Sequence, residues 1–121
     1  MQSKHGKLSY GLIIEQVEDC LRLFSAFRSY EVVDATESTV KIKIYIRKNI
    51  YVQLYANSFK DKLNLALIHG DERIYGEDSE GGVLHVHPFD DHLSHQNSNE
   101  QISVETFLAR VQDFLETEGL I

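Results

Sequence analysis

The chain has 121 residues, which is enough for one domain with its own hydrophobic core and too few for two. Hydrophobic residues make up 42% and charged residues 26%, values typical of a folded, soluble globular protein. The net charge of −7 excludes a protein that attaches to nucleic acid or anionic membranes through overall positive charge.

Cysteine content and apolar patterning indicate where the protein works. Cys20 is the only cysteine, so the chain cannot form an internal disulfide, as suits a reducing cytoplasm. The first seven residues lack the apolar core of a signal peptide, and no apolar run approaches the roughly 18 residues of a membrane-spanning helix. We therefore expect a cytoplasmic protein with no membrane association, in which residues 1–8 form a flexible tail and residues 9–121 a single domain.

Two segments carry apolar residues at the three- and four-residue spacing of an amphipathic helix. The first begins after Ser9, which can serve as its N-cap. Its apolar residues are Ile13, Val17, Cys20, Leu21, Phe24 and Phe27. The second begins after Ser103, another N-cap candidate. Its apolar residues are Val104, Phe107, Leu108, Val111, Phe114 and Leu115. Because Cys20 lies on the apolar side, we expect a buried, unreactive thiol.

Between these helices the apolar period changes to two, which is typical of strands. The segments that show it are 30–33, 39–46, 50–56, 63–68, 73–75 and 83–87. A three-residue loop at 47–49 would pair Ile46 with Ile50, with Asn49 in the left-handed conformation. The near-continuous apolar run at 63–68 predicts a central strand covered on both faces. The whole pattern predicts an α+β fold with about five mostly antiparallel strands and both helices on one face of the sheet.

The last third of the strand region carries the chemically suggestive residues. Alternation along 73–75 places Arg73 and Tyr75 on one side of their strand, and an acidic, glycine-rich loop is expected at 76–82. The same alternation along 83–87 places His85 and His87 on one face. A polar connection at 88–102 then carries His92 and His95.

Two lysines, three tyrosines and a glutamine share the sheet face that the helices leave open. They are Lys41, Lys43, Tyr45, Tyr51, Gln53 and Tyr55. Lysines interleaved with tyrosines can contact phosphates and stack on bases. Both residue types are also common on an ordinary solvated strand face, so the pattern alone does not decide between the two interpretations.

The histidines allow two kinds of site. His85 and His87 can hold zinc or another divalent transition metal, with His92 and His95 completing the ligands, although the spacing matches no closed structural zinc motif. Alternatively, His85 and His87 act as base and acid on a ribose and a leaving oxygen without any cofactor, and Arg73 binds the phosphoryl group. Tyr75, Lys43, Tyr51 and Tyr55 are then the substrate contacts. Surface histidines without a function are the third interpretation.

A family resemblance joins these motifs. The segments Arg73-Ile-Tyr-Gly, His85-Val-His87-Pro-Phe and Ser103-Val-Glu-Thr-Phe-Leu together resemble the TumE-type toxins of toxin–antitoxin pairs. In that family an arginine-containing strand precedes a proline- and histidine-rich segment, so the resemblance gives these roles to Arg73, His85, His87 and His92. The chain differs in having residues 76–82 in place of a compact Asp-Asn-x-Pro-His-His segment, and in being acidic.

The leading hypothesis is therefore a toxin-like, metal-independent endoribonuclease that uses His85, His87 and Arg73. The resemblance implies a cognate antitoxin as partner and RNA as substrate, and a second copy of the chain is another expected partner. One alternative is a non-catalytic module that binds protein through its tyrosine-rich sheet face. The other is a small metal-dependent enzyme with histidine ligands.

Overall fold

The computed structural model describes residues 10–81, 83–87, 96–98 and 103–121, which form two helices and seven strands. Along the chain these are α1 (Tyr10–Leu23), β1 (Ser29–Ala35), β2 (Thr39–Arg47), β3 (Ile50–Asn57), β4 (Lys62–His69), β5 (Glu72–Glu80), β6 (Val83–His87), β7 (Gln96–Ser98) and α2 (Val104–Thr117). The expected α+β class is confirmed, with two strands more than the five anticipated. Three predictions lie outside the described residues: the flexible tail at 1–8, the cap at Ser9, and the segment that contains His92 and His95.

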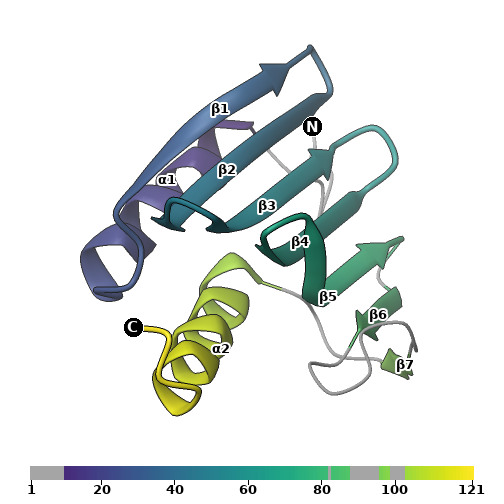
Figure 1. The fold of residues 1–121 in the computed structure, drawn as a ribbon. Coiled ribbons are helices and arrows are strands. Elements are labelled where there is room, and N and C mark those ends of the chain that lie inside the picture. Colours follow the sequence, from purple (N-terminus) through teal and green to yellow (C-terminus); the bar gives the residue numbers. More distant parts are fainter. Residues whose placement is uncertain (1–9, 82, 88–95, 99–102) are drawn as a thin grey trace.

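The seven described strands form one sheet in the order β1-β2-β3-β4-β5-β6-β7 (Figure 1). Each strand is antiparallel to the next one in the chain. Consecutive strands are therefore always neighbours, and side chains that alternate along the sequence line up in rows across the sheet.

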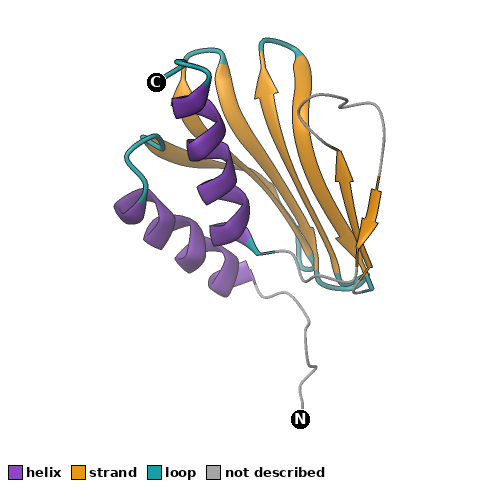
Figure 2. Ribbon diagram, turned by 90° about the horizontal axis from the view of Figure 1, so that it is seen from below, coloured by secondary structure: helices purple, strands orange, loops and turns teal. Residues whose placement is uncertain are grey.

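Both helices lie on the same side of this sheet (Figure 2). On that side β2, β3 and β4 bury every second residue, including Ile42, Leu54 and Leu65, which are fully inaccessible to solvent. Both helices bury apolar residues of the predicted stripes, with Val17 and Cys20 from α1 and Phe107 from α2 in the same core. The first stripe is wrong at its end, because α1 stops at Leu23 and the core residues Phe24 and Phe27 belong to the segment that follows it. Burial of these stripes, not helix propensity, is what holds short helices of this length in place.

On the other side of the sheet the side chains are only half-buried. The prediction that residues 63–68 form a strand covered on both faces is wrong, because Asn64, Ala66 and Ile68 lie on this uncovered side. The apolar run looked continuous only because Ala66 and Ile68 are apolar residues placed where partial exposure is tolerated.

The start of α2 agrees with its predicted cap. Ser103 has an extended backbone, and its side-chain oxygen accepts a hydrogen bond of 3.1 Å from the backbone N–H of Thr106. Near the other helix, the backbone N–H of Ala26 donates to Oε1 of Gln112 on α2 at 3.0 Å. This bond joins the segment after α1 to the last turns of α2. No helix in the described part of the chain is both long and apolar enough to cross a membrane.

The β2–β3 hairpin corrects one predicted register. Ile44 pairs with Val52, but Arg47 pairs with Ile50 in place of the predicted Ile46, because a bulge interrupts the ladder after Tyr45. The turn thus contains two residues, and the extra residue in the bulge restores the match of the two apolar faces. Asp61 is the only described non-glycine residue with a positive φ, so the left-handed conformation expected of Asn49 is also wrong.

Candidate functional site

The uncovered side of the sheet, here called the open face, carries the polar and aromatic residues of the central strands. Cross-strand pairing places Lys41 beside Tyr55, Tyr55 beside Asn64, Asn64 beside Asp78 and Asp78 beside His85. This row crosses the sheet from β2 to β6. A parallel row contains Lys43, Gln53, Ala66 and Gly76, and a third contains Tyr45, Tyr51, Ile68 and Arg73.

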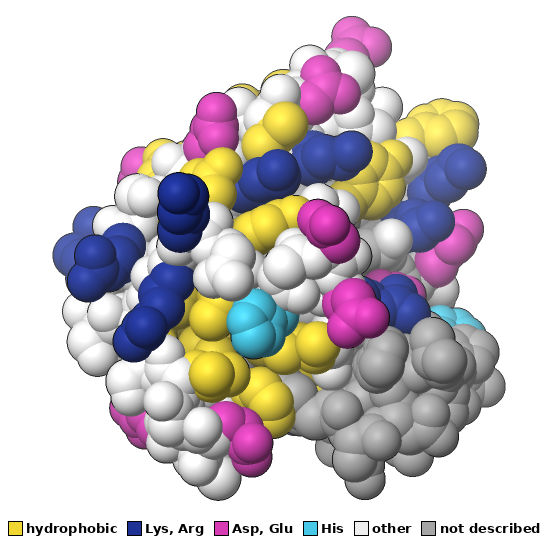
Figure 3. All heavy atoms as spheres, in the orientation of Figure 1, with side chains coloured by type: hydrophobic (Ala, Val, Ile, Leu, Met, Phe, Trp, Pro, Cys, Tyr) yellow, Lys and Arg dark blue, Asp and Glu magenta, His cyan; other side chains and the backbone are white. Residues whose placement is uncertain are grey.

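The lysines and tyrosines of the open face contact one another. Lys43 Nζ lies 4.8 Å from the ring centroid of Tyr51, a cation–π distance, and the Tyr51 ring centroid is 6.1 Å from that of Tyr45. The hydroxyl of Tyr45 donates to Glu31 at 2.8 Å, and this hydrogen bond raises the pKa of Tyr45 above its ordinary value. Figure 3 shows Lys and Arg side chains (dark blue) beside hydrophobic side chains (yellow) on this face. The yellow class includes Tyr.

Arg73 and Tyr75 do not share a side of β5. Arg73 pairs with Ile68 and Tyr75 pairs with the next residue back, Leu67, so Ile74 is an extra residue in a β-bulge. Tyr75 is therefore buried under α2, where its ring stacks on Phe107 with centroids 5.5 Å apart. The prediction that Tyr75 stands beside the histidines as a substrate contact is wrong, while Arg73 lies on the open face.

Two adjoining pockets on the open face contain Arg73 and His85. The first is lined by Lys41, Gln53, Tyr55, Asn64, Ala66, Ile68, Arg73 and Asp78. The second is lined by Lys62, Asn64, Asp78, Ser79, Glu80 and His85. Asn64 and Asp78 belong to both pockets, so the pocket of Arg73 and the pocket of His85 adjoin at these two residues.

The structure describes less of the other histidines that were predicted for the site. His87 lies in β6, where its backbone pairs with Gly76, and its side chain is outside what the structure describes. His92 and His95 lie outside the described residues altogether. Among the described side chains, no group of three or more His, Cys, Asp or Glu is arranged to hold a metal ion. The four-histidine metal site thus stays a prediction.

A buried charged cluster lies on the opposite, helix-covered side of β5. The carboxylate of Glu77, of which only 1% is exposed, accepts hydrogen bonds from the hydroxyl of Tyr75 and from Arg110 Nη1 of α2, the latter at 2.5 Å. Burial, followed by the bond to Glu77, raises the pKa of Tyr75 and keeps its hydroxyl protonated. Burial lowers the pKa of Arg110, but the hydrogen bond and the charge of Glu77, together with contributions from Tyr75, outweigh this effect and raise the pKa overall. The cluster fixes α2 against β5.

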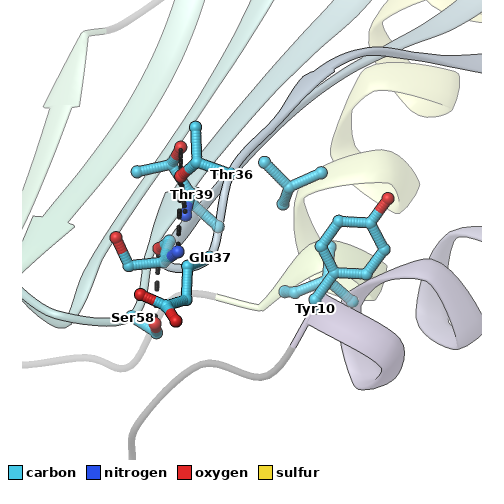
Figure 4. Close-up of a pocket in the computed structure, with 9 residues that line it drawn as sticks. Tyr10, Thr36, Glu37, Thr39 and Ser58 are labelled. Carbon is cyan, nitrogen blue, oxygen red and sulfur yellow. Dashed lines mark hydrogen bonds between the residues drawn. The ribbon is translucent and has the colours of Figure 1, made fainter.

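A third hollow lies at the β1–β2 turn (Figure 4). Tyr10 of α1 faces it from one side, and Thr36, Glu37, Thr39 and Ser58 lie on the other. The polar groups here serve the turn itself: the hydroxyl of Thr36 accepts from the backbone N–H of Thr39 at 3.0 Å, and the two threonine hydroxyls are 2.6 Å apart. The polar groups in this hollow therefore have a structural role in the turn, and the open face remains the better candidate for the functional site.

No family model, curated protein or solved structure matches the chain. The resemblance to TumE-type toxins consequently stays a prediction, and the residues of the open face are the remaining indication of function.

Asp78 and Asn64 are the residues that the sequence interpretation missed. Residues 76–82 were expected to form a loop, whereas β5 continues to Glu80 and Asp78 pairs with both neighbouring strands. A usable signal was present, because two consecutive glycines between alternating segments are typical of a two-residue hairpin turn. Gly81 has the positive φ of 61° that such a turn requires, and placing the turn there pairs Asp78 with His85.

Proposed function

We propose that this protein binds single-stranded RNA on the open face and cleaves it as a metal-independent endoribonuclease. The observation that supports the proposal best is the position of Arg73 and His85 in adjoining pockets of one exposed sheet face. Lys41 and Tyr55 line the pocket of Arg73 and belong to the same cross-strand row as His85. A cationic group for the phosphate, an imidazole for proton transfer and an aromatic ring for the base are the parts that such a reaction needs.

In the proposed reaction, one imidazole of the His85–His87 pair removes the proton from a ribose 2′-hydroxyl, and the oxygen attacks the adjacent phosphorus. The bond from phosphorus to the 5′-oxygen breaks, and the other imidazole protonates that oxygen. The products are a 2′,3′-cyclic phosphate and a free 5′-hydroxyl. Arg73 stabilises the negative charge that grows on the phosphoryl oxygens during the attack.

The remaining open-face residues would bind the strand. Tyr51 and Tyr55 are half-buried on β3 and offer ring surface for stacking, which contributes about 1–3 kcal/mol per base in proteins of this kind. Lys43 lies over Tyr51 and brings a positive charge next to one stacking surface. The acidic net charge is compatible with this arrangement, because local charge on the binding face governs contact with phosphates.

The test is cleavage of a labelled oligoribonucleotide in the presence of EDTA. We expect His85→Ala and Arg73→Ala to lower the rate by roughly 10²–10⁴-fold, the usual effect of losing an acid–base or charge-stabilising group. His69→Ala is the matched control, because His69 is half-buried at the end of β4 and lines neither open-face pocket. Equal rates for wild type, His85→Ala and His69→Ala, or products without a cyclic phosphate, would contradict the proposal.

Expression in cells provides a second test and bears on partners and location. A cytoplasmic ribonuclease toxin should slow growth, His85→Ala or His87→Ala should relieve this effect, and a cognate antitoxin should do the same when co-expressed. The two alternative functions predict different results. If Tyr51→Ala and Tyr55→Ala abolish a protein complex while the histidine variants behave like wild type, the protein is a non-catalytic interaction module.

Zinc at one equivalent in protein purified without an affinity tag, with activity lost in EDTA, would support the metal-dependent enzyme.

A further inference from the structure

Asp78 lies directly opposite His85 on the paired strands β5 and β6. Both side chains are half-buried and both line the same open-face pocket. Residues directly opposite each other in an antiparallel pair have Cβ atoms about 4.5–5.5 Å apart, which is within reach of a carboxylate–imidazole hydrogen bond.

The residues around Asp78 favour a functional role in the site over that of an ordinary solvent-exposed carboxylate. On its other side Asp78 pairs with Asn64 of β4, and both residues line the pocket of Arg73 as well as that of His85. The side-chain Oδ1 of Asn64 is buried and accepts no hydrogen bond from the described residues. Asp78 is the one acidic side chain that borders both open-face pockets, as far as the described residues line them.

An imidazole that transfers a proton must present one particular ring nitrogen to its substrate. A carboxylate that accepts the N–H of the other nitrogen fixes both the tautomer and the orientation of the ring. We propose that Asp78 is the positioning residue of His85, holding one ring nitrogen so that the other faces the RNA. Its effect on catalysis rests on the proposed function, whereas its effect on the ring does not.

Nitrogen-15 NMR of the His85 ring tests the proposal without requiring any activity. At pH 8 the wild-type ring should show two well-separated nitrogen shifts, the signature of a single tautomer. In Asp78→Ala the two shifts should converge as the tautomers mix, and Asp78→Asn serves the same purpose if the alanine variant fails to fold. Glu80→Gln is the matched control, because Glu80 lines the same pocket but pairs with Val83 and lies 3.9 Å from Lys62.

Cleavage kinetics then separate the two proposals. We expect Asp78→Ala to lower kcat by roughly 10- to 100-fold with KM changed less than about twofold, since a positioning residue acts mainly in the transition state. Asp78→Glu should recover part of the loss. An unchanged His85 ring spectrum in the Asp78 variants would overturn the positioning role even if RNA is cleaved. A changed spectrum in a protein that cleaves no RNA would uphold it and end the ribonuclease proposal.

Discussion

Replacing Arg110 with methionine should destabilise the fold by about 2–3 kcal/mol. Two unit charges with centres about 4 Å apart attract by roughly 4 kcal/mol at an effective dielectric constant near 20. Solvent screens part of this attraction, because 43% of the Arg110 side chain is exposed. The larger cost falls on Glu77, which is almost fully buried and, among the described residues, would keep only the Tyr75 hydroxyl as a partner.

Urea unfolding followed by circular dichroism measures this loss. Arg22→Met is the matched control, since Arg22 pairs with Asp19 on the exposed surface of α1 and should change stability by less than about 0.5 kcal/mol. Adding Glu77→Gln to Arg110→Met should restore part of the stability, because a neutral amide costs less to bury than an unpaired carboxylate. If Arg110→Met is as stable as Arg22→Met, the ion pair between Arg110 and Glu77 does not hold α2 against the sheet.

Three further predictions concern the core and its edges. Leu65→Ala removes a fully buried side chain and should cost about 2–5 kcal/mol in the same unfolding assay. Ser103→Ala should cost about 1 kcal/mol through loss of the α2 cap, and a loss no larger than that of an exposed serine would contradict the cap's role. Burial, with smaller contributions from Glu105 and Asp19, raises the pKa of Cys20 from 9.0 to about 11, so the folded state resists thiol ionisation. This contribution to stability is complete below pH 9 and is lost as the pH rises to 11; Cys20→Ala should remove that part of the pH dependence of unfolding.

The helices and the alternating strands could be predicted because their signals are local. The stripe from Ile13 to Cys20 and the alternation from Val40 to Ile46 depend only on residues a few positions apart, and burial follows both patterns. The bulges at Ile46 and Ile74 could not be predicted in the same way, since a bulge is decided jointly by two strands. The consequence is largest at Ile74, which sends Tyr75 to the core.

In the candidate site, too, local signals predicted some residues and missed those that depend on neighbouring strands. His85 is where alternation placed it, but Asp78 lay in a stretch whose glycines and acids are typical of loops. That stretch is a strand because β4 and β6 pair with it on both sides. The carboxylate of Glu77 is tolerated there because Arg110, 33 residues further along the chain, neutralises it. Composition within a short window contains no information about such a distant partner.

The order of the strands also affects how the chain acquires its structure during synthesis. Each strand finds its partner among the residues made just before it, so the sheet can grow as the ribosome releases the chain at roughly 5–20 residues per second. The helices are different, because Ala26 reaches Gln112 across 86 positions. The apolar stripe of α1 and the core face of the sheet therefore stay incompletely covered until α2 has emerged. A nascent chain stalled before Val104 would present that surface to chaperones, and release of the last turns of α2 would withdraw it.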